Sequence, residues 1–520
     1  ASLESYLLPE ENRDFSENNM KNLLSSAYPE GFDYTPDEGG NHLMSTAYLA
    51  RWSGPVDEAD DPYDPSNYSS VYSPTGLRVQ KHIRDVLIIP DRKSPMDNDN
   101  IKSAVQNYGA VYTTMYVDPA YYSPDQRYYY FNNDISYPNH AVAIVGWNDS
   151  FDKNQFSNVP PGNGAFIVKN SWGKTWGEDG YFYVSYYDTK LGYDGNVVFT
   201  AENTDNYDSI YQYDPLGWVN SVGYSNPTCW CANVFTAKSY EVLKAVGFYT
   251  TDSNCNYEIY IHTDPEFSPI SRTGYVLAQS GTIPFAGYHT IPLNSGVKLK
   301  AGQKFSVVLK LTTPGYNFPI AFEYPRSGYS SKARANTGES FISPNGIKWE
   351  DLTAHYPNAN VCVKAFTYPI SFPVANFSSN VSEGYVPLNV QFNDSSRNAT
   401  GWYWDFGDGN YSTEQNPVHV YSRIGTYPVN LTASNDNGTD SKLATIAVLK
   451  QPAYAYIANM GSNTISVIDT AKDIVITTVE AGAGPYGVGV SPDGKKVYVA
   501  NNDSNTVSAI DTATNTVTAT

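Results

Sequence analysis

The architecture of this chain follows from two segments, N-H-A-V-A-I-V-G-W at 139–147 and G-A-F-I-V-K-N-S-W-G-K-T-W-G-E-D-G-Y-F-Y-V-S-Y-Y at 164–187. They contain three short apolar runs, rich in β-branched and aromatic residues and separated by Gly and Asn, at 141–147, 165–168 and 181–187. Such runs predict neighbouring strands. His140 then begins one strand, and Asn170 follows the end of the next.

The residues at these strand ends have the chemistry needed to activate a nucleophile. An imidazole does so when one ring nitrogen faces the nucleophile and a hydrogen-bond partner holds the other, which fixes the tautomer. The side-chain oxygen of an Asn can be that partner, and a Trp just after the Asn can cover the pair and exclude water. His140, Asn170 and Trp172 supply these residue types in the order typical of Cys–His–Asn hydrolases.

Two separated motifs, with the strand pattern between them, carry a resemblance to a known family. N-H-A-V-A-I-V-G-W followed by K-N-S-W-G-x-x-W-G-E-x-G-Y resembles the second half of a papain-like cysteine peptidase. The resemblance implies a two-lobed α+β domain over residues 1–205, with His140 and Asn170 as catalytic residues and Trp172 in support. The alternative is a buried His and a turn Asn in an unrelated β-barrel.

The nucleophile that this family requires is missing from the chain. It lies about 130–150 residues before the His in such enzymes, which places it close to Ala1. All four cysteines come after Asn170. Ala1–Leu8 starts without a cap signal and resembles the later turns of the family's central helix, whose first turn reads C-W-A-F. We therefore expect the Cys just before Ala1 and no peptide hydrolysis by residues 1–520 alone. The alternatives are a natural pseudo-enzyme or a Ser replacement such as Ser2.

Two glycines are candidates for substrate binding. Gly39 and Gly40 precede a segment of helical periodicity that reaches Trp52. They resemble the segment whose backbone pairs with substrate in papain-like peptidases, and glycine permits such an approach because it has no Cβ. A simple helix-entry turn is the alternative. The resemblance implies substrate binding by Gly39, Gly40 and Asn139, whereas His42 is expected on the surface.

Local signals place two further helices in the same domain. The first is predicted at 16–27, with Ser16 as its cap. The second is predicted at 97–108, capped by Asp or Asn and closed by Gly109. The first strand of the second lobe is expected directly after it, at 110–117.

The composition favours an extracellular or cell-surface protein of several domains. A chain of 520 residues is too long for one hydrophobic core. Its net charge of −20 repels nucleic acid and anionic membranes, so neither is an expected partner. No apolar run reaches the roughly 18 residues of a membrane span.

Residues 206–370 read as a β-sandwich, because strand-like segments alternate with Gly, Pro and Asn turns. The segments V-G-F-Y-T-T and A-G-Q-K-F-S-V-V-L-K, placed after a papain-like domain, resemble the lectin-like domain of some prokaryotic surface peptidases. One or two disulfides are expected here, with the pairing left open among Cys229, Cys231, Cys255 and Cys362. A zinc site built from three of these with His262 fits no standard spacing, so no metal or other cofactor is expected.

Two more modules are predicted toward the C-terminus. Residues 371–450 resemble a PKD domain, an immunoglobulin-like sandwich, on the motif W-Y-W-D-F-G-D-G at 402–409. Within residues 451–520, Y-I-A-N-M-G-S-N-T-I-S-V-I-D-T at 456–470 recurs as Y-V-A-N-N-D-S-N-T-V-S-A-I-D-T at 498–512, an offset of 42 residues. The period suits a four-stranded propeller blade, and the repeat resembles YVTN-type propellers. S-P-D-G at 491–494 predicts a hairpin turn. Fewer than two blades are present, whereas a closed propeller needs about four to eight.

The sequence therefore predicts a multidomain chain. An α+β papain-like two-lobed domain is followed by all-β modules, namely a β-sandwich, a PKD sandwich and a partial β-propeller. These resemblances imply a secreted or cell-surface cysteine endopeptidase that acts on a protein or peptide, with attachment modules for surface glycans or other surface proteins. The alternative is a non-catalytic surface adhesion or carbohydrate-binding protein with a pseudo-peptidase domain.

Overall fold

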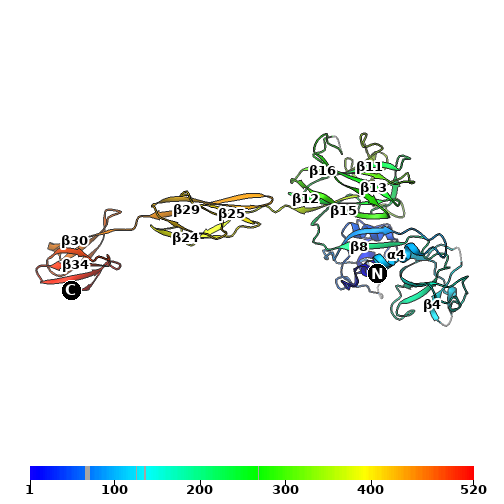
Figure 1. Cartoon of the computed structure of the whole chain (residues 1–520), viewed down its shortest axis with the longest axis horizontal. Coiled ribbons are helices and arrows are strands. Elements are labelled where there is room, and N and C mark those ends of the chain that lie inside the picture. Colours follow the sequence, from blue (N-terminus) through cyan, green and yellow to red (C-terminus); the bar gives the residue numbers. More distant parts are fainter. Residues whose placement is uncertain (65–70, 124–125, 134–135, 267–268) are drawn as a thin grey trace. The chain divides into compact units, whose positions relative to one another are not determined.

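The computed structural model describes all residues except 65–70, 124–125, 134–135 and 267–268. The chain divides into two compact units, Ala1–Ile370 and Ser371–Thr520, whose elements are labelled in Figure 1. Within the described residues, no helix is both long and apolar enough to cross a lipid bilayer.

The α-helices described in the first unit are short, and local signals set their ends. They are α1 (Ser2–Leu7), α2 (Glu17–Leu23), α3 (His42–Ala50) and α4 (Asp99–Tyr108). Ser16 Oγ accepts a hydrogen bond from the N–H of Asn19 and caps α2 as predicted, although α2 ends four residues early. Asn41 caps α3, which stops two residues before Trp52. α4 is closed by Gly109 and has Asn98 at its N-cap position, as predicted, although the side chain of Asn98 makes no capping hydrogen bond.

A sheet of twelve strands runs through the first unit. The three strands predicted from the opening motifs are confirmed as β5 (His140–Asn148), β6 (Ala165–Lys169) and β7 (Tyr181–Ser185). The strand order is β3-β4-β7-β6-β5-β2-β8-β1-β15-β12-β21-β9. The other members are β3 (Tyr122–Ser123), β4 (Gln126–Tyr130), β2 (Val111–Met115), β8 (Val197–Glu202), β1 (His82–Ile88), β15 (Ala286–Leu299), β12 (Glu241–Thr250), β21 (Val363–Pro369) and β9 (Ser209–Tyr211).

This sheet crosses the boundary expected at residue 205. Strand β1 pairs with β8 on one side and with β15 on the other, and Asp85 lies opposite His289. Figure 1 labels β8 on one side of this boundary and β15 and β12 on the other, and β1 lies between β8 and β15 in the sheet. The Nδ1 atom of His289 lies 3.1 Å from the carboxylate of Asp85. We call this pairing the β1–β15 junction. It joins the two predicted domains through backbone hydrogen bonds.

The hydrophobic core also spans this boundary. Leu3 of α1 and Tyr48 of α3 belong to the same buried cluster as Tyr288 and Cys362, which come from beyond residue 205. Arg51 is buried at the same place and donates hydrogen bonds to backbone oxygens, including that of Pro215 at 3.1 Å. Residues 1–370 therefore form one compact unit, although the sequence predicts two domains there.

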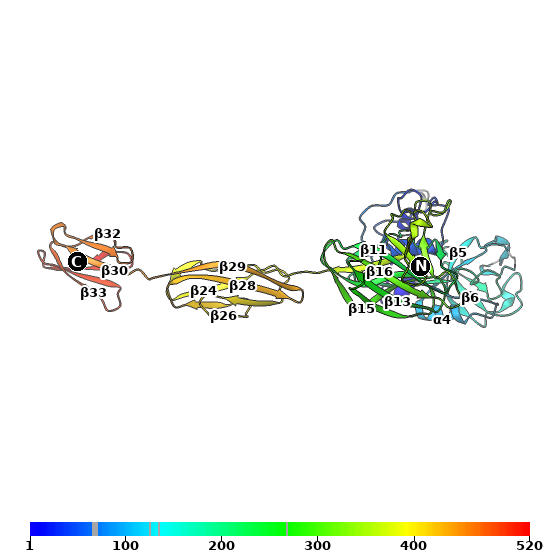
Figure 2. The same ribbon diagram turned by 90° about the horizontal axis from the view of Figure 1, so that it is seen from above.

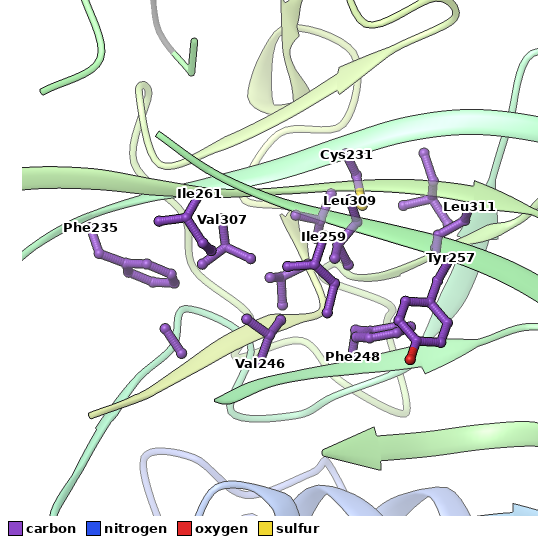
Figure 3. Close-up of a cluster of buried hydrophobic side chains, with 14 of the residues drawn as sticks. Cys231, Phe235, Val246, Phe248, Tyr257, Ile259, Ile261, Val307, Leu309 and Leu311 are labelled. Atoms are coloured by element: carbon purple, nitrogen blue, oxygen red, sulfur yellow. The ribbon is translucent and has the colours of Figure 1, made fainter. Parts of the chain in front are cut away.

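The predicted β-sandwich is present. One of its two layers is the part of the twelve-stranded sheet that contains β12. The other is a six-stranded sheet in the order β14-β13-β16-β11-β18-β19, and a three-stranded sheet has the order β10-β17-β20. Side chains of β12, including Val246 and Phe248, point toward Ile259 and Leu309 of the six-stranded sheet (Figure 3). The strands are β14 (Tyr275–Ile283), β13 (Cys255–Thr263), β16 (Lys304–Thr312), β11 (Thr228–Thr236), β18 (Ser340–Ser343), β19 (Glu350–Asp351), β10 (Asn220–Val222), β17 (Ile320–Glu323) and β20 (Asn360–Val361).

The expectation of disulfides is wrong, because all four cysteines are free and buried. Cys229, Cys231 and Cys255 belong to the sandwich core, where Figure 3 labels Cys231, and Cys362 lies in the core shared with the helices. In the part of the chain that the structure describes, no group of His, Cys, Asp and Glu side chains has the geometry to hold a metal. His262 instead contacts Ser271. The cysteines therefore act as small apolar residues of the core.

In the second unit, residues 371–449 form two packed sheets around Trp404 and Phe406, which are both buried. Gly407 and Gly409 follow β25 with positive φ, as expected for a tight turn. Figure 2 labels β28 and β29, which pair along the length of this module, and β24 of the other sheet. The strands are β22 (Phe377–Ser379), β23 (Glu383–Tyr385), β24 (Leu388–Asp394), β25 (Gly401–Asp405), β26 (Tyr411–Ser412), β27 (Val418–Tyr421), β28 (Gly425–Asn435) and β29 (Gly438–Leu449).

The internal repeat forms two antiparallel sheets, one of three strands and one of four. The predicted hairpin turn at 491–494 is confirmed, because Ser491 and Lys496 pair across it. Whether these sheets belong to a propeller stays a prediction. The strands are β30 (Tyr454–Asn459), β31 (Thr464–Asp469), β32 (Ile474–Glu480), β33 (Pro485–Val490), β34 (Lys496–Asn501), β35 (Thr506–Asp511) and β36 (Thr516–Ala519).

Candidate active site

The antiparallel pairing of β5 and β6 brings His140 and Asn170 together. His140 is the first residue of β5, and Asn170 directly follows β6, in which Lys169 lies opposite Ala143. Because the start of one antiparallel strand lies beside the end of its neighbour, both side chains lie at the same end of this strand pair. The Nε2 atom of His140 lies 2.9 Å from the Oδ1 atom of Asn170.

This contact fixes the state of the imidazole. An amide oxygen can only accept, so the neutral ring carries its proton on Nε2 and leaves Nδ1 as an acceptor. Asn170 is itself held in place, because its N–H donates to the carbonyl of Gly180 at 2.9 Å and its Oδ1 also accepts from the N–H of Ser171 at 2.8 Å. The pair can therefore take a proton at a defined ring nitrogen.

Trp172 lies against the imidazole as the sequence predicted. Its ring centroid is 5.2 Å from that of His140, at an interplanar angle of 37°. The side chain of Trp172 is 45% exposed. Its ring packs on that of Trp176, with 4.9 Å between the centroids, and the ring of Trp176 packs on that of Phe182 with 5.1 Å between the centroids. Trp176 was not singled out from the sequence, although it stands in the same G-x-x-W-G motif. Trp176 thus supports Trp172 where it contacts the ring of His140.

The side chain of Asn139 is hydrogen-bonded within the protein rather than left free for a substrate. It accepts from the N–H of Val117 at 2.7 Å and donates to the carbonyl of Val117 at 3.0 Å. It thereby extends the pairing between β2 and β5 just before His140. Asn139 is exposed and directly precedes His140, and its N–H donates to the carbonyl of Met115 at 3.0 Å.

A cavity of about 260 Å³ brings the two predicted glycines near the same end of this strand pair. Gly39 and Gly40 line it together with Ala141, the neighbour of His140, and Tyr112 of β2. The sequence did not identify the remaining lining residues, because they come from three elements that only the fold brings together: Glu17, Met20, Lys21, Leu24, Ser25, Tyr34, Thr35, Pro36, Asn41, Met44 and Ser45.

Two titratable groups near the cavity have shifted pKa values. Glu17 is accessible to solvent, but the surrounding protein displaces enough water to raise the pKa of its carboxyl. His42 is half-buried, with its ring 6.0 Å from that of Tyr112, and burial lowers the pKa of its imidazole. The expectation that His42 lies on the surface is therefore wrong, because the start of α3 packs against β2.

None of the four thiols in this chain is suited to act as the nucleophile. All four are buried, and burial raises the pKa of each one. A buried thiol with a raised pKa is a poor nucleophile. The hydroxyl of Ser2 donates to the carbonyl of Ala110 at 2.5 Å and is almost fully buried, which argues against Ser2 as a replacement nucleophile.

Comparison with known families decides the class of this domain. The model of the papain family of cysteine proteases matches residues 16–200. The chain carries a papain-family cysteine peptidase domain. After this domain, the lectin-like domain model matches residues 210–367 and the PKD domain model matches residues 371–449.

Solved structures show the same order of a papain-family domain and a lectin-like domain. A clostridial cysteine protease, Cwp84 after propeptide cleavage, is 28% identical, covers 71% of this chain and 92% of its own, and has a TM-score of 0.62. The protease and lectin-like domains of Cwp84, described as a surface layer associated protein of Clostridium difficile, give 28% identity, 71% and 82% coverage, and a TM-score of 0.60.

Curated relatives match shorter parts. Cathepsin Q of Rattus norvegicus is 28% identical over 170 residues, which is 32% of this chain and 44% of the relative. Collagenase ColQ1 of Bacillus cereus is 35% identical over 120 residues, which is 20% of this chain and 12% of the relative. The chain thus spans less than half the length of either protein.

Proposed function

We propose that the first unit is a cysteine endopeptidase in which His140 is the acid–base residue and Asn170 its positioning partner. The contact between Nε2 of His140 and Oδ1 of Asn170 carries the proposal, because it leaves Nδ1 of His140 free to serve a thiol. A thiolate paired with protonated His140 would attack the peptide carbonyl, and His140 would then donate its proton to the leaving amine. Water would resolve the acyl-enzyme.

The thiol must come from a residue outside this set of four cysteines. Each of those is buried, and Cys229, Cys231 and Cys255 belong to the core of the sandwich. We place the thiol on a helical turn preceding Ala1, in continuation of α1. Residues 1–520 by themselves are then expected to bind peptides without cleaving them.

The cavity next to His140 suits an apolar substrate side chain. Its wall includes Met20, Met44 and Tyr112 together with Gly40. The substrate backbone would run along Gly39 and Gly40, where no Cβ obstructs it, and past Asn139. An exposed carboxyl, Glu17, at the wall would also tolerate a basic group at the end of such a side chain.

The remaining modules suit a secreted or cell-surface enzyme. Cwp84, which shares the papain-family and lectin-like domains, is described as surface layer associated. We propose that the lectin-like, PKD and repeat regions hold the peptidase near its substrates through glycans or surface proteins, with the repeats forming part of a β-propeller.

The decisive experiment is to join a C-W-A-F turn before Ala1 and to measure cleavage of an unstructured protein under reducing conditions. We expect cleavage that disappears when the added Cys is replaced by Ser and when His140 is replaced by Ala. His355→Ala is the matched control, because His355 is exposed in the sandwich. If the folded, Cys-bearing protein is inert, the peptidase assignment fails, and a surface adhesion protein with a pseudo-peptidase domain takes its place.

A further inference from the structure

Asparagine followed two residues later by Ser or Thr is concentrated in residues 371–449. This spacing, N-x-S/T with x other than Pro, is the acceptor motif for N-linked glycosylation. Seven of the ten Asn residues in this module begin the motif, compared with three of the thirty-seven Asn residues elsewhere in the chain. The seven are Asn376, Asn380, Asn393, Asn398, Asn410, Asn430 and Asn437.

Strand alternation by itself does not explain this density. Residues i and i+2 of a strand lie on the same face, so polar positions that face solvent can produce the spacing without any further meaning. The repeat sheets of residues 454–520 test this explanation, because they too are strands with many Asn, Ser and Thr residues. Of their six Asn residues, only Asn502 begins the motif. The motif is therefore enriched in residues 371–449 beyond what an Asn-rich β module requires.

Three of the seven residues lie on the solvent side of the sheet β22-β24-β27. Asn393 of β24 is exposed, whereas the neighbouring Phe392 is buried in the core of the module. Asn376 and Asn380 directly precede and follow β22, and both are exposed, whereas Phe377 of β22 is buried. Strands β22 and β24 pair with each other. The three Asn residues are therefore accessible on two adjacent strands.

The amide nitrogens of these three residues are free of protein partners. The Oδ1 atom of Asn380 accepts from the N–H of Gln391 at 2.9 Å, and the Oδ1 atom of Asn376 accepts from the ammonium group of Lys442. In the part of the chain that the structure describes, the Nδ2 atoms of Asn376, Asn380 and Asn393 have no hydrogen-bond acceptor. Because a glycan is attached through Nδ2, these three side chains can react without losing a hydrogen bond of the fold.

The other four residues are less suitable, because the protein engages their side chains. The Nδ2 atoms of Asn398 and Asn437 donate to backbone carbonyls at 3.3 and 3.2 Å. The Nδ2 atom of Asn430 donates at 3.4 Å to the hydroxyl of its own motif. The side chain of Asn410 is hydrogen-bonded to Asp408. Modification of these residues would remove contacts of the folded module.

We propose that Asn376, Asn380 and Asn393 carry N-linked glycans. The donor is an oligosaccharide joined through phosphate to a lipid carrier. The Nδ2 atom forms a bond to the anomeric carbon of the first sugar as the bond from that carbon to the phosphate oxygen breaks. The amide loses one proton, and the phosphate leaves with the electron pair of the broken bond. This inference rests on the proposed cell-surface location, because transfer from a lipid carrier takes place on chains that leave the cytoplasm.

Peptide mapping by mass spectrometry tests the proposal on the protein recovered from the surface or medium of the cells that naturally produce it. We expect an oligosaccharide mass on Asn376, Asn380 and Asn393. Ser395→Ala should abolish the modification of Asn393 although the Asn remains, because Ser395 supplies the hydroxyl of that motif, and Ser395→Thr should retain it. Asn389→Gln is the matched control, because Asn389 is an exposed residue of β24 outside any motif, and it should leave all three glycans in place.

The outcomes separate glycosylation from location. If the three Asn residues are unmodified in protein found at the cell surface, the glycosylation proposal is overturned and the proposed location stands. If the protein never leaves the cytoplasm, the proposed location fails and glycosylation fails with it. Glycans found only on the four engaged residues, or a Ser395→Ala protein still modified at Asn393, would also overturn the proposal. Both substituted positions are exposed, and an unchanged circular dichroism spectrum confirms that each variant is folded.

Discussion

Replacing Glu323 by Gln tests whether the first unit holds a protonated carboxyl at its centre. Glu323 lies in β17 and is fully buried. Its Oε2 accepts from the N–H of Leu216 at 2.5 Å, whereas its Oε1 has no hydrogen-bond partner among the described residues. Burial and then the neighbouring carboxylate of Asp214 raise the pKa of Glu323 well above 4.5, although the cations Lys364 and Arg51 act in the opposite direction.

The sign and size of the effect follow from proton linkage. Between pH 4.5 and the raised pKa, the folded state holds a proton on Glu323 that the unfolded state has lost. The stability that this proton provides is complete below pH 4.5 and is lost as the pH rises toward the pKa of the folded state. The free energy of unfolding therefore falls by about 1.4 kcal/mol per pH unit in this interval. Gln cannot titrate, so Glu323→Gln should remove this part of the slope.

Urea unfolding at pH 5, 6 and 7, followed by tryptophan fluorescence, measures the slope in both proteins. Glu10→Gln is the matched control, because Glu10 is exposed and its replacement should leave the slope unchanged. The second unit is identical in all three proteins, so its contribution cancels in the comparison. Equal slopes for the wild type and Glu323→Gln would refute the reasoning and would mean that Glu323 is ionised in the folded protein.

Three further predictions address other parts of the chain. Arg51→Met should lower the free energy of unfolding of the first unit by about 2–5 kcal/mol, because buried carbonyls, including that of Pro215, lose their donor; an unchanged urea midpoint would contradict this. His419→Ala should destabilise the second unit by about 1–3 kcal/mol, because the ring stacks on Phe406 at 4.2 Å and bonds to Asp408 at 2.8 Å, and calorimetry would show the loss as a lower melting temperature. All four cysteines should resist a thiol reagent in the folded protein and react once it is unfolded without reductant, whereas fewer than four reactive thiols would reveal a disulfide.

The candidate site was predictable because its residues are placed by local sequence. His140 and Asn170 stand at the ends of two short strands joined in sequence, and the apolar runs define those strands directly. Their partner Trp172 is two residues away from Asn170. The motif therefore contains both the chemistry and the geometry, and only the contact distance had to come from the structure.

Other features depend on contacts between distant parts of the chain. Strands β1 and β15 are about 200 residues apart, and nothing in the pattern of either strand specifies its partner. The prediction of disulfides was wrong for the same reason, because the number of cysteines in the sequence does not show how far apart they lie in the fold. His42 was misplaced because its burial comes from Tyr112, which belongs to a strand of the other lobe.

The β1–β15 junction has a consequence for any attempt to isolate the peptidase. In the sheet order, β15 covers the backbone groups along one side of β1. A chain cut near residue 205 would expose β1 as an unpaired edge whose Ile83 and Val86 are apolar and normally buried. Such an edge is a template for intermolecular strand pairing. The shortened protein should therefore aggregate, and its soluble expression should require the sandwich to be supplied on the same chain.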